Sequence, residues 1–399
     1  MRRSCLLGDA ITLKRGYDLP HQHRQEGNVP VVSSAGITGT HAEYRVRGPG
    51  VVTGRYGTLG EVHYVPNDFW PLNTTLYVQD FKGNDPRYIA YLLRTLDFGS
   101  RSGAAAVPGV NRNDLHRLPI SLPDVKEQCR IASILSAYDD LIENNTRRIA
   151  ILEEMARRIY EEWFVRFRFP GHEQVKIVES ELGLIPDGWL QTAVGDCVTI
   201  HRGKSYKSAE LTDEGGLPFV NLKCIERDGG FRKSGLKRFT GTYKESQKVA
   251  TGDLVIAVTD MTQERRIVAR CGRVPRLGAD FGVISMDLVK IDADKGVPRN
   301  FMYGTFRWSG FADEVKQHAN GANVLHLAPE RIAGFRFPLP PPAISDHFAE
   351  LTFPMLQQCD VLLDKNEALR VIRDLLVPKL ISGELDVSTL PEPEEAIAA

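Results

Sequence analysis

Hydrophobic positions recur most regularly between Lys126 and Phe169, a stretch of 44 residues without glycine or proline. From Ile131 onward, every fourth and then third residue is non-polar or aromatic, with a single asparagine among them. These positions are Ile131, Leu135, Tyr138, Ile142, Asn145, Ile149, Leu152, Ala156, Ile159 and Trp163. A narrow stripe kept over about four heptads is typical of a coiled-coil seam. The pattern predicts a helical rod of roughly 60 Å at 1.5 Å per residue.

The ends of this rod carry helix start and stop signals. Asp124 with Glu127 three residues later forms a capping-box pattern, and Pro170-Gly171 marks the end. We therefore expect a long spacer helix over residues 124–169, followed by a charged linker over 170–183.

A second long helix is expected over residues 341–385. Its stripe is poorer, and Pro354 is expected to kink the helix or end its first segment. The stripe positions are Met355, Cys359, Leu362, Asn366, Leu369, Arg373, Leu376 and Leu380. We expect the two helices to pair antiparallel with Asn145 facing Asn366, because a buried asparagine pair fixes register while lowering stability. Asn145→Leu should then raise thermal stability and loosen the register.

The regions before each long helix show short β-rich runs between turn residues. In residues 1–123 the expected strands are Val29–Val32, Gly50–Thr53 and Thr75–Val78, with a helix over Pro86–Leu96. In residues 184–340 they are Leu217–Val220, Asp253–Ala257 and Ile284–Leu288, with a helix over Asn300–Phe306. The predicted fold class is α+β, with two β-rich mixed domains separated by two long helices that form an antiparallel coiled coil. Residues 386–399 are expected to form an acidic, disordered tail.

An internal duplication connects the two halves. Leu7-Gly8-Asp9, followed by Thr12 to Gly16, corresponds to Val194-Gly195-Asp196, followed by Thr199 to Gly203, at an offset of 187 residues. Inside the long helices, Asn145 corresponds to Asn366 at an offset of 221. One unit of globular region plus long helix therefore occurs twice.

Composition adds few constraints. Hydrophobic content is 42%, charged content is 25% and the formal net charge is −1, ordinary values for a soluble globular protein. Charge is uneven, since residues 200–245 carry 10 Lys/Arg and 6 Asp/Glu. The six scattered cysteines suggest reduced thiols. With no export signal and no apolar run long enough for a membrane span, we expect a cytoplasmic protein.

Catalytic motifs are absent from the sequence. Gly203-Lys204-Ser205 resembles the end of a phosphate-binding loop, but Val198 stands where that motif requires glycine. His21 and His23 near Glu26 could hold a metal, yet a polar loop is the simpler interpretation without a third placed ligand. The sequence predicts no catalytic residue, no metal site and no cofactor bound by this chain.

Glycine-punctuated loops rich in basic, amide and aromatic residues are the remaining candidate chemistry. Arginine suits guanine, asparagine suits adenine, and lysine or threonine suits phosphate. Any single loop could be an ordinary solvated turn, whereas the same set in both halves favours DNA binding. The candidate residues are Lys14, Arg15, Tyr17, Arg55, Tyr56, Thr58, Asn111, Arg112 and Asn113 in the first half, and Arg202, Lys204, Tyr206, Lys207, Arg265, Arg266 and Asn323 in the second.

The chain resembles the specificity subunit of a type I restriction–modification system over nearly its whole length. The resemblance is carried by Leu122-Pro123 with Glu127-Gln128, Ile131–Leu135 leading to Asp139–Asn145, Ile185–Trp189, and Pro378–Leu385. It departs from the family in two places. The first copy has no counterpart of Ile185–Trp189, and the second helix has Ser345-Asp346 where the first has Glu-Gln.

This resemblance implies a non-catalytic reader of double-stranded DNA. Each globular region would be a target recognition domain for one half of an asymmetric, split target, and the helices would set the spacing. Two methyltransferase subunits would dock on the helices, where Arg147-Arg148, Glu153-Glu154 and Arg157-Arg158 are candidate contacts, and restriction subunits would join them. S-adenosylmethionine, ATP and Mg²⁺ would belong to those partners.

Two other interpretations remain open. The chain could be a coiled-coil scaffold or adaptor that binds proteins through its two globular ends. It could also be the recognition half of a split single-chain restriction–modification enzyme, which would differ only in the identity of its partners.

Overall fold

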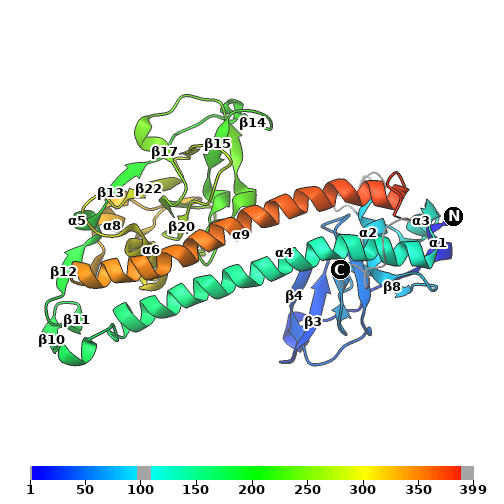
Figure 1. The fold of residues 1–399 in the computed structure, drawn as a ribbon, viewed down its shortest axis with the longest axis horizontal. Helices are drawn as coiled ribbons and strands as arrows, with labels where there is room; N and C mark the ends of the chain where they lie inside the picture. Colours follow the sequence, from blue (N-terminus) through cyan, green and yellow to red (C-terminus); the bar gives the residue numbers. More distant parts are fainter. Residues whose placement is uncertain (1, 97–108, 388–399) are drawn as a thin grey trace. The chain divides into compact units, whose positions relative to one another are not determined.

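The computed structural model describes residues 2–96 and 109–387, which form two compact units (Figure 1). The first unit contains the residues up to Glu143 together with those from Asn366 onward, and the second contains Asn144–Lys365. The predicted acidic tail lies outside the described residues from position 388 onward. Within the described ranges, no helix combines the length and hydrophobicity that crossing a bilayer requires.

The described residues of the first unit form three antiparallel or mixed sheets. The strand orders are β2-β8-β5-β6, β4-β3-β7 and β1-β9. The strands are β1 (Arg3–Leu6), β2 (Thr12–Arg15), β3 (Val29–Ser33), β4 (Gly36–His41), β5 (Gly50–Gly54), β6 (Val62–Val65), β7 (Trp70–Pro71), β8 (Thr75–Asp80) and β9 (Pro119–Leu122). The short helices are α1 (Leu7–Ala10), α2 (Pro86–Arg94) and α3 (Arg112–His116), with a 3-10 turn at His21–His23.

The described residues of the second unit form one four-stranded sheet, like that of the first unit, one five-stranded sheet and three two-stranded sheets. They are β13-β22-β18-β20, β14-β16-β15-β21-β17, β12-β24, β19-β23 and the hairpin β10-β11. The strands are β10 (Ile177–Ser180), β11 (Gly183–Pro186), β12 (Leu190–Ala193), β13 (Thr199–Arg202), β14 (Leu211–Thr212), β15 (Leu217–Val220), β16 (Lys237–Phe239), β17 (Lys248–Val249), β18 (Leu254–Ala257), β19 (Thr259–Asp260), β20 (Cys271–Arg273), β21 (Gly282–Ile284), β22 (Leu288–Asp292), β23 (Leu325–His326) and β24 (Arg336–Leu339). The short helices are α5 (Val194–Cys197), α6 (Arg299–Trp308), α7 (Phe311–Val315) and α8 (Pro329–Ala333). Further 3-10 turns lie at His172–Gln174, Ser208–Glu210, Leu222–Cys224, Lys233–Gly235, Glu245–Gln247 and Lys316–His318.

The first long helix, α4, runs over Val125–Tyr160 and continues as a π-helical segment over Glu161–Val165. Asp124 caps its start, since the backbone N–H of Glu127 donates to Asp124 Oδ1 at 2.9 Å. The Glu127 carboxylate pairs with Arg2 at 2.9 Å. The expected extension to Phe169 is wrong. The backbone takes a left-handed conformation at Phe167 (φ 56°), and the buried Phe164 and Phe169 belong to the domain core.

The second long helix, α9, runs over Pro342–Ser382. The expectation that Pro354 ends its first segment is wrong, because the helix continues through that position. It stops before the predicted residue 385 because Gly383 adopts a left-handed conformation (φ 84°), as is common at helix C-termini.

Within each unit, a segment of α4 pairs antiparallel with a segment of α9. In the first unit, Arg373 forms an ion pair with Asp139, and Asn366 Nδ2 donates to the Ile142 carbonyl at 3.2 Å. In the second unit, the Cys359 thiol lies 3.9 Å from the Ile149 carbonyl, and the Trp163 ring packs on His347. All predicted stripe positions of both helices are buried or half-buried. This confirms the predicted seam and, with it, the α+β fold class.

The predicted pairing of Asn145 with Asn366 joins residues of different units and stays a prediction. Both side chains are buried, as a register-fixing pair requires.

The internal duplication is visible in the backbone. In α1 the Asp9 carboxylate accepts from the Leu6 amide at 3.1 Å, and in α5 Asp196 accepts from the Ala193 amide at 3.3 Å. The glycine within each of these helices packs closely on a second short helix, since a Cβ at Gly8 would touch His116 and one at Gly195 would touch Ala333. Two copies of one backbone unit are therefore present.

Most predicted strands and helices are present, with one error among the strands. Ile284–Leu288 is not a single strand but the end of β21, a turn over Ser285–Asp287 and the start of β22. The Ser285 hydroxyl accepts from the Asp287 amide at 3.3 Å and thereby stabilises the turn without a glycine or proline.

Each unit has its own core, which includes both β-rich elements and the long helices. In the first unit Ile131 and Leu135 of α4 and Leu380 of α9 pack with residues of α1, β5 and α2. In the second unit Tyr160, Phe164 and Phe348 pack with Phe301 of α6. The helices are thus integral to the cores of the globular regions.

Candidate nucleic-acid interface

The predicted basic loops of the first unit meet at one edge of the sheet β2-β8-β5. Arg15 at the end of β2 and Gly54 at the end of β5 lie opposite Leu76 and Thr75 at the start of β8. Backbone hydrogen bonds hold the residues that follow β2 and β5 in place. Gly16 N donates to Thr75 O at 3.1 Å, and Arg55 N donates to Thr74 O at 2.9 Å. We call this the first edge.

Aromatic rings support the basic side chains of the first edge. Lys14 Nζ lies 5.9 Å from the centre of the Tyr17 ring, and the Arg55 guanidinium lies 4.6 Å from the Tyr56 ring. The Tyr17 hydroxyl also hydrogen-bonds that of Tyr77 at 3.0 Å. The attraction between each cation and the face of its neighbouring ring favours these side-chain positions.

A third predicted loop joins the same edge. Tyr56 forms a β-bridge with Gly109, and Val110 N donates to Arg55 O at 3.0 Å. The Asn111 side chain caps α3 by accepting from the Asn113 amide at 2.9 Å, so its amide oxygen has a structural role. Arg112, Asn113 and Thr58 are exposed.

The second unit builds an equivalent edge from β13, β22 and β18. Arg202 and Ala257, the last residues of β13 and β18, lie opposite Val289 and Leu288 at the start of β22. The hydrogen bond from Gly203 N to Leu288 O, at 3.2 Å, repeats that from Gly16 to Thr75. We call this the second edge.

The candidate residues of β13 and the loop after it differ in their surroundings. Arg202 is exposed and pairs with Glu330 at 3.2 Å. Lys204 forms a parallel bridge with Ser285 and is half-buried. Tyr206 instead packs edge-on against Phe219 at 4.8 Å, and burial raises the pKa of its hydroxyl. Lys207 is exposed and precedes a 3-10 turn.

Two further predicted loops are held together beside the second edge. Gln263 donates to the carbonyl of Ala322 at 3.0 Å, and Arg265 donates to Gln317 at 3.1 Å. Arg265 is thereby tied to the protein, Arg266 pairs with Glu264, and Asn323 is exposed. In each unit the predicted residues thus lie on loops at or beside one sheet edge, except Tyr206, which packs into a small core with Phe219.

Sequence reasoning missed residues on the turns that precede β8 and β22. Asn73 lies on the first turn and Met286 on the second, and Met261 lies on the loop that follows β19. The duplication could have identified positions 73 and 286 as equivalent, but these turns are not separated by the constant offset of 187 residues.

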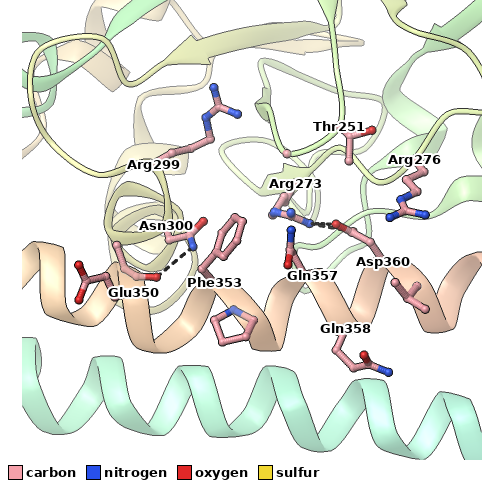
Figure 2. A pocket seen from close by; sticks show the side chains of 14 residues that line it. Thr251, Arg273, Arg276, Arg299, Asn300, Glu350, Phe353, Gln357, Gln358 and Asp360 are labelled. Atoms are coloured by element: carbon pink, nitrogen blue, oxygen red, sulfur yellow. Dashed lines mark hydrogen bonds and ion pairs between the residues drawn. The ribbon is translucent and has the colours of Figure 1, made fainter.

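A hollow of about 920 Å³ lies between α9 and the globular part of the second unit (Figure 2). Three arginines line it, and each faces a carboxylate. Arg273 pairs with Asp360 at 2.8 Å, Arg276 with Asp364 at 3.6 Å, and Arg299 with Asp253 at 3.2 Å. The positive charges are already matched, so the hollow is better described as a charged contact between the domain and its helix than as an anion site.

The polar residues of α4 named as docking candidates are not equally accessible. Glu154 pairs with Arg157 and Arg158, both at 2.7 Å, on the helix surface. Glu153 is half-buried, and burial raises the pKa of its carboxyl despite the nearby Arg307. Glu153 is therefore less accessible to a partner than Arg147, Arg148 and Arg158, which are exposed.

Comparison with known proteins finds similar sequences. Residues 5–154 match the type I restriction modification DNA specificity domain. The chain is 27% identical over 316 residues to the type I restriction enzyme MjaIX specificity subunit of Methanocaldococcus jannaschii, covering 76% of this chain and 70% of that protein. It is 30% identical to the MjaVIII specificity subunit of the same organism, over 37% of this chain and 34% of that protein.

The fold also has a counterpart among solved structures. The crystal structure of the S subunit of a type I restriction–modification system from M. genitalium superposes with a TM-score of 0.61 at 15% identity, covering 97% of each chain. In its sequence matches and in its fold, the chain is similar to the specificity subunits of type I restriction–modification systems.

Proposed function

We propose that this chain is the non-catalytic, DNA-reading subunit of a type I restriction–modification complex and that its two domains read different halves of one asymmetric target. The observation that carries the proposal is the repeated edge. The two edges share strand order and backbone hydrogen bonds but present different side chains, such as Tyr17 in the first and Lys204 in the second. Two edges with the same backbone arrangement but different side chains are suited to contact two different base sequences.

Methylation mapping tests this proposal. We expect a host that expresses this chain with its methyltransferase to carry modified adenines in one bipartite, asymmetric motif. Arg55→Ala should weaken discrimination in the half read by the first domain, and Arg202→Ala in the half read by the second. Each loss should be about 1–3 kcal/mol per lost base contact. Arg336→Ala, on β24 and not part of the sheet that forms the second edge, is the matched control. A single palindromic motif would contradict the proposal.

We infer further that the long helices dock two copies of the methyltransferase subunit. Ile151 on α4 and Ile372 on α9 are equivalent at the offset of 221 residues, and they are 58% and 44% exposed. Each has a further exposed apolar neighbour on its helix, Met155 for Ile151 and Leu375 for Ile372. Exposed apolar patches of this kind commonly mark protein interfaces, and two equivalent patches suit two copies of one partner.

Subunit stoichiometry tests the docking. Ile151→Asp and Ile372→Asp should each reduce the bound methyltransferase from two copies to one, and the double variant should bind none, as measured by native mass spectrometry. Leu190→Asp, an exposed apolar position on β12, is the control. Full stoichiometry in the double variant would refute these patches. In this assembly S-adenosylmethionine, ATP and Mg²⁺ belong to the methyltransferase and restriction subunits.

The alternative of a protein-binding adaptor makes a different prediction. A DNA reader should bind its target stoichiometrically together with the methyltransferase, and the affinity should fall steeply with salt. An adaptor should show neither property. The genes beside this one would distinguish a multi-subunit system from a split single-chain enzyme.

A further inference from the structure

The turn before β22 holds its central residue firmly at the second edge. Met286 N donates to Lys204 O at 2.8 Å, and Ser285 N donates to Val220 O at 2.8 Å. On the other side Val258 N donates to Asp287 O, also at 2.8 Å. Three strand ends therefore fix the backbone of Met286, while half of its side chain remains exposed.

The first edge has the same turn with a different side chain. Leu72 N donates to Val32 O at 2.8 Å, as Ser285 donates to Val220, and Tyr17 bridges Leu72 as Lys204 bridges Ser285. A Cβ at Gly16 would overlap the Leu72 carbonyl, and one at Gly203 would overlap that of Ser285. Positions 73 and 286 are thus equivalent, and they carry an asparagine in one domain and a methionine in the other.

A second exposed methionine is held near this edge. Met261 is 67% exposed and follows Asp260, which is buried. The Asp260 carboxylate accepts from the amides of Thr262, Ile267 and Val268 at 2.9, 2.7 and 3.2 Å. The loop that presents Met261 is therefore anchored at its base.

Exposed methionines near exposed cations such as Arg202 and Lys207 are suited to bind a ligand with both apolar and anionic groups. A DNA major groove provides phosphates along its rim and one apolar group among its base edges, the 5-methyl of thymine. We propose that Met286 reads a thymine by packing on its 5-methyl group and that Met261 adds a second apolar contact of this kind. The inference rests on the proposed DNA-reading function and assigns a chemical role within it.

Deoxyuridine substitution tests this contact, because uracil pairs as thymine does but lacks the methyl group. The probe is the complex of this chain with its methyltransferase, bound to duplexes of its mapped target. Each thymine of the half read by the second domain is replaced in turn. At the Met286 contact we expect the Kd to rise about fourfold, which corresponds to one buried methyl group at about 0.8 kcal/mol.

Protein variants identify the residue responsible. Met286→Ala should bind the thymine and uracil duplexes equally, whereas Met286→Leu, which keeps an apolar side chain, should still prefer thymine. Leu190→Ala, which removes an exposed apolar side chain from β12, should retain the full preference. Met261→Ala should remove sensitivity at a different thymine.

The outcomes separate this inference from the proposed function. Specific binding with no uracil effect at any position, or an unchanged thymine preference in Met286→Ala, overturns the role of Met286 alone. The absence of any sequence-specific binding overturns the proposed function and this inference with it.

Discussion

At the scale of single residues, side chains at the two edges divide into those that build the loops and those that are free to contact a ligand. Asn111 and Tyr206 were predicted from residue type alone, yet one caps a helix and the other fills a small core. At the strand ends, Arg55 is half-buried against the Tyr56 ring, and Arg202 is exposed and paired with Glu330. Residue type predicts the chemistry of a loop, whereas hydrogen-bond partners decide which side chains remain available.

His116 makes the stability of the first unit depend on pH. Its Nε2 accepts from the Leu13 amide at 2.9 Å, which requires the neutral ring. Burial, with Arg112 and Lys82 nearby, lowers the pKa of His116 below its ordinary value of 6.5. The unfolded chain therefore binds the proton more readily, so the free energy of unfolding should fall as the pH drops below about 6.5.

Urea unfolding at pH 7.5 and pH 5.5 measures this effect. The loss of stability between the two values should be smaller in His116→Gln, whose side-chain oxygen can accept the same hydrogen bond without titrating. An equal loss in both proteins would show that His116 is not responsible.

Arg273 and Asp360 form a largely buried ion pair between β20 and α9, with side chains 12% and 7% exposed. Burial raises the pKa of Asp360, and the facing guanidinium opposes that rise. Removing only one member leaves an uncompensated buried charge. Arg273→Met should therefore lower the free energy of unfolding by about 3–5 kcal/mol, whereas Arg273→Met with Asp360→Leu should come close to the wild type. Additive losses in the double variant, measured by urea denaturation, would contradict this account.

At the scale of elements, the long helices were predicted most successfully. Their hydrophobic residues recur at 4-3 spacing over many residues, and every stripe position is buried or half-buried. The prediction failed where tertiary structure overrides local pattern. The end of α4 depends on Phe164 and Phe169 entering the domain core, and the turn at Ser285–Asp287 depends on hydrogen bonds that no composition signal marks.

Pro354 lies in the interior of α9, where proline is unfavourable, yet the helix continues through it. Proline lacks the amide that would bond the carbonyl of residue 350 and disfavours a helix interior by about 3 kcal/mol relative to alanine. Asn300 Nδ2 donates to the Ala349 carbonyl at 3.4 Å, in the turn just before it (Figure 2). Pro354→Ala should therefore raise the melting temperature, and Asn300→Ala should lower it. A lower melting temperature for Pro354→Ala would show that packing in this turn requires the proline.

At the scale of the whole molecule, the proposed function makes the paired helices a determinant of target spacing. Insertion of seven residues keeps each hydrophobic stripe in phase, because the seam repeats every heptad. Seven residues lengthen a helix by about 10.5 Å, the rise of about three base pairs at 3.4 Å each. The change must be made in both helices, after Glu143 in α4 and after Lys365 in α9, so that the antiparallel seam remains matched.

Methylation mapping with this doubly lengthened chain should give the same two half-sites separated by about three more base pairs, since the reading edges are unchanged. A heptad inserted in α4 alone should instead mismatch the seam, lower the melting temperature and abolish methylation. An unchanged spacer in an active, doubly lengthened complex would mean that the target spacing is set elsewhere. The two half-sites would then be positioned by contacts with the partner subunits, and the helices would serve only to hold the cores of the two units.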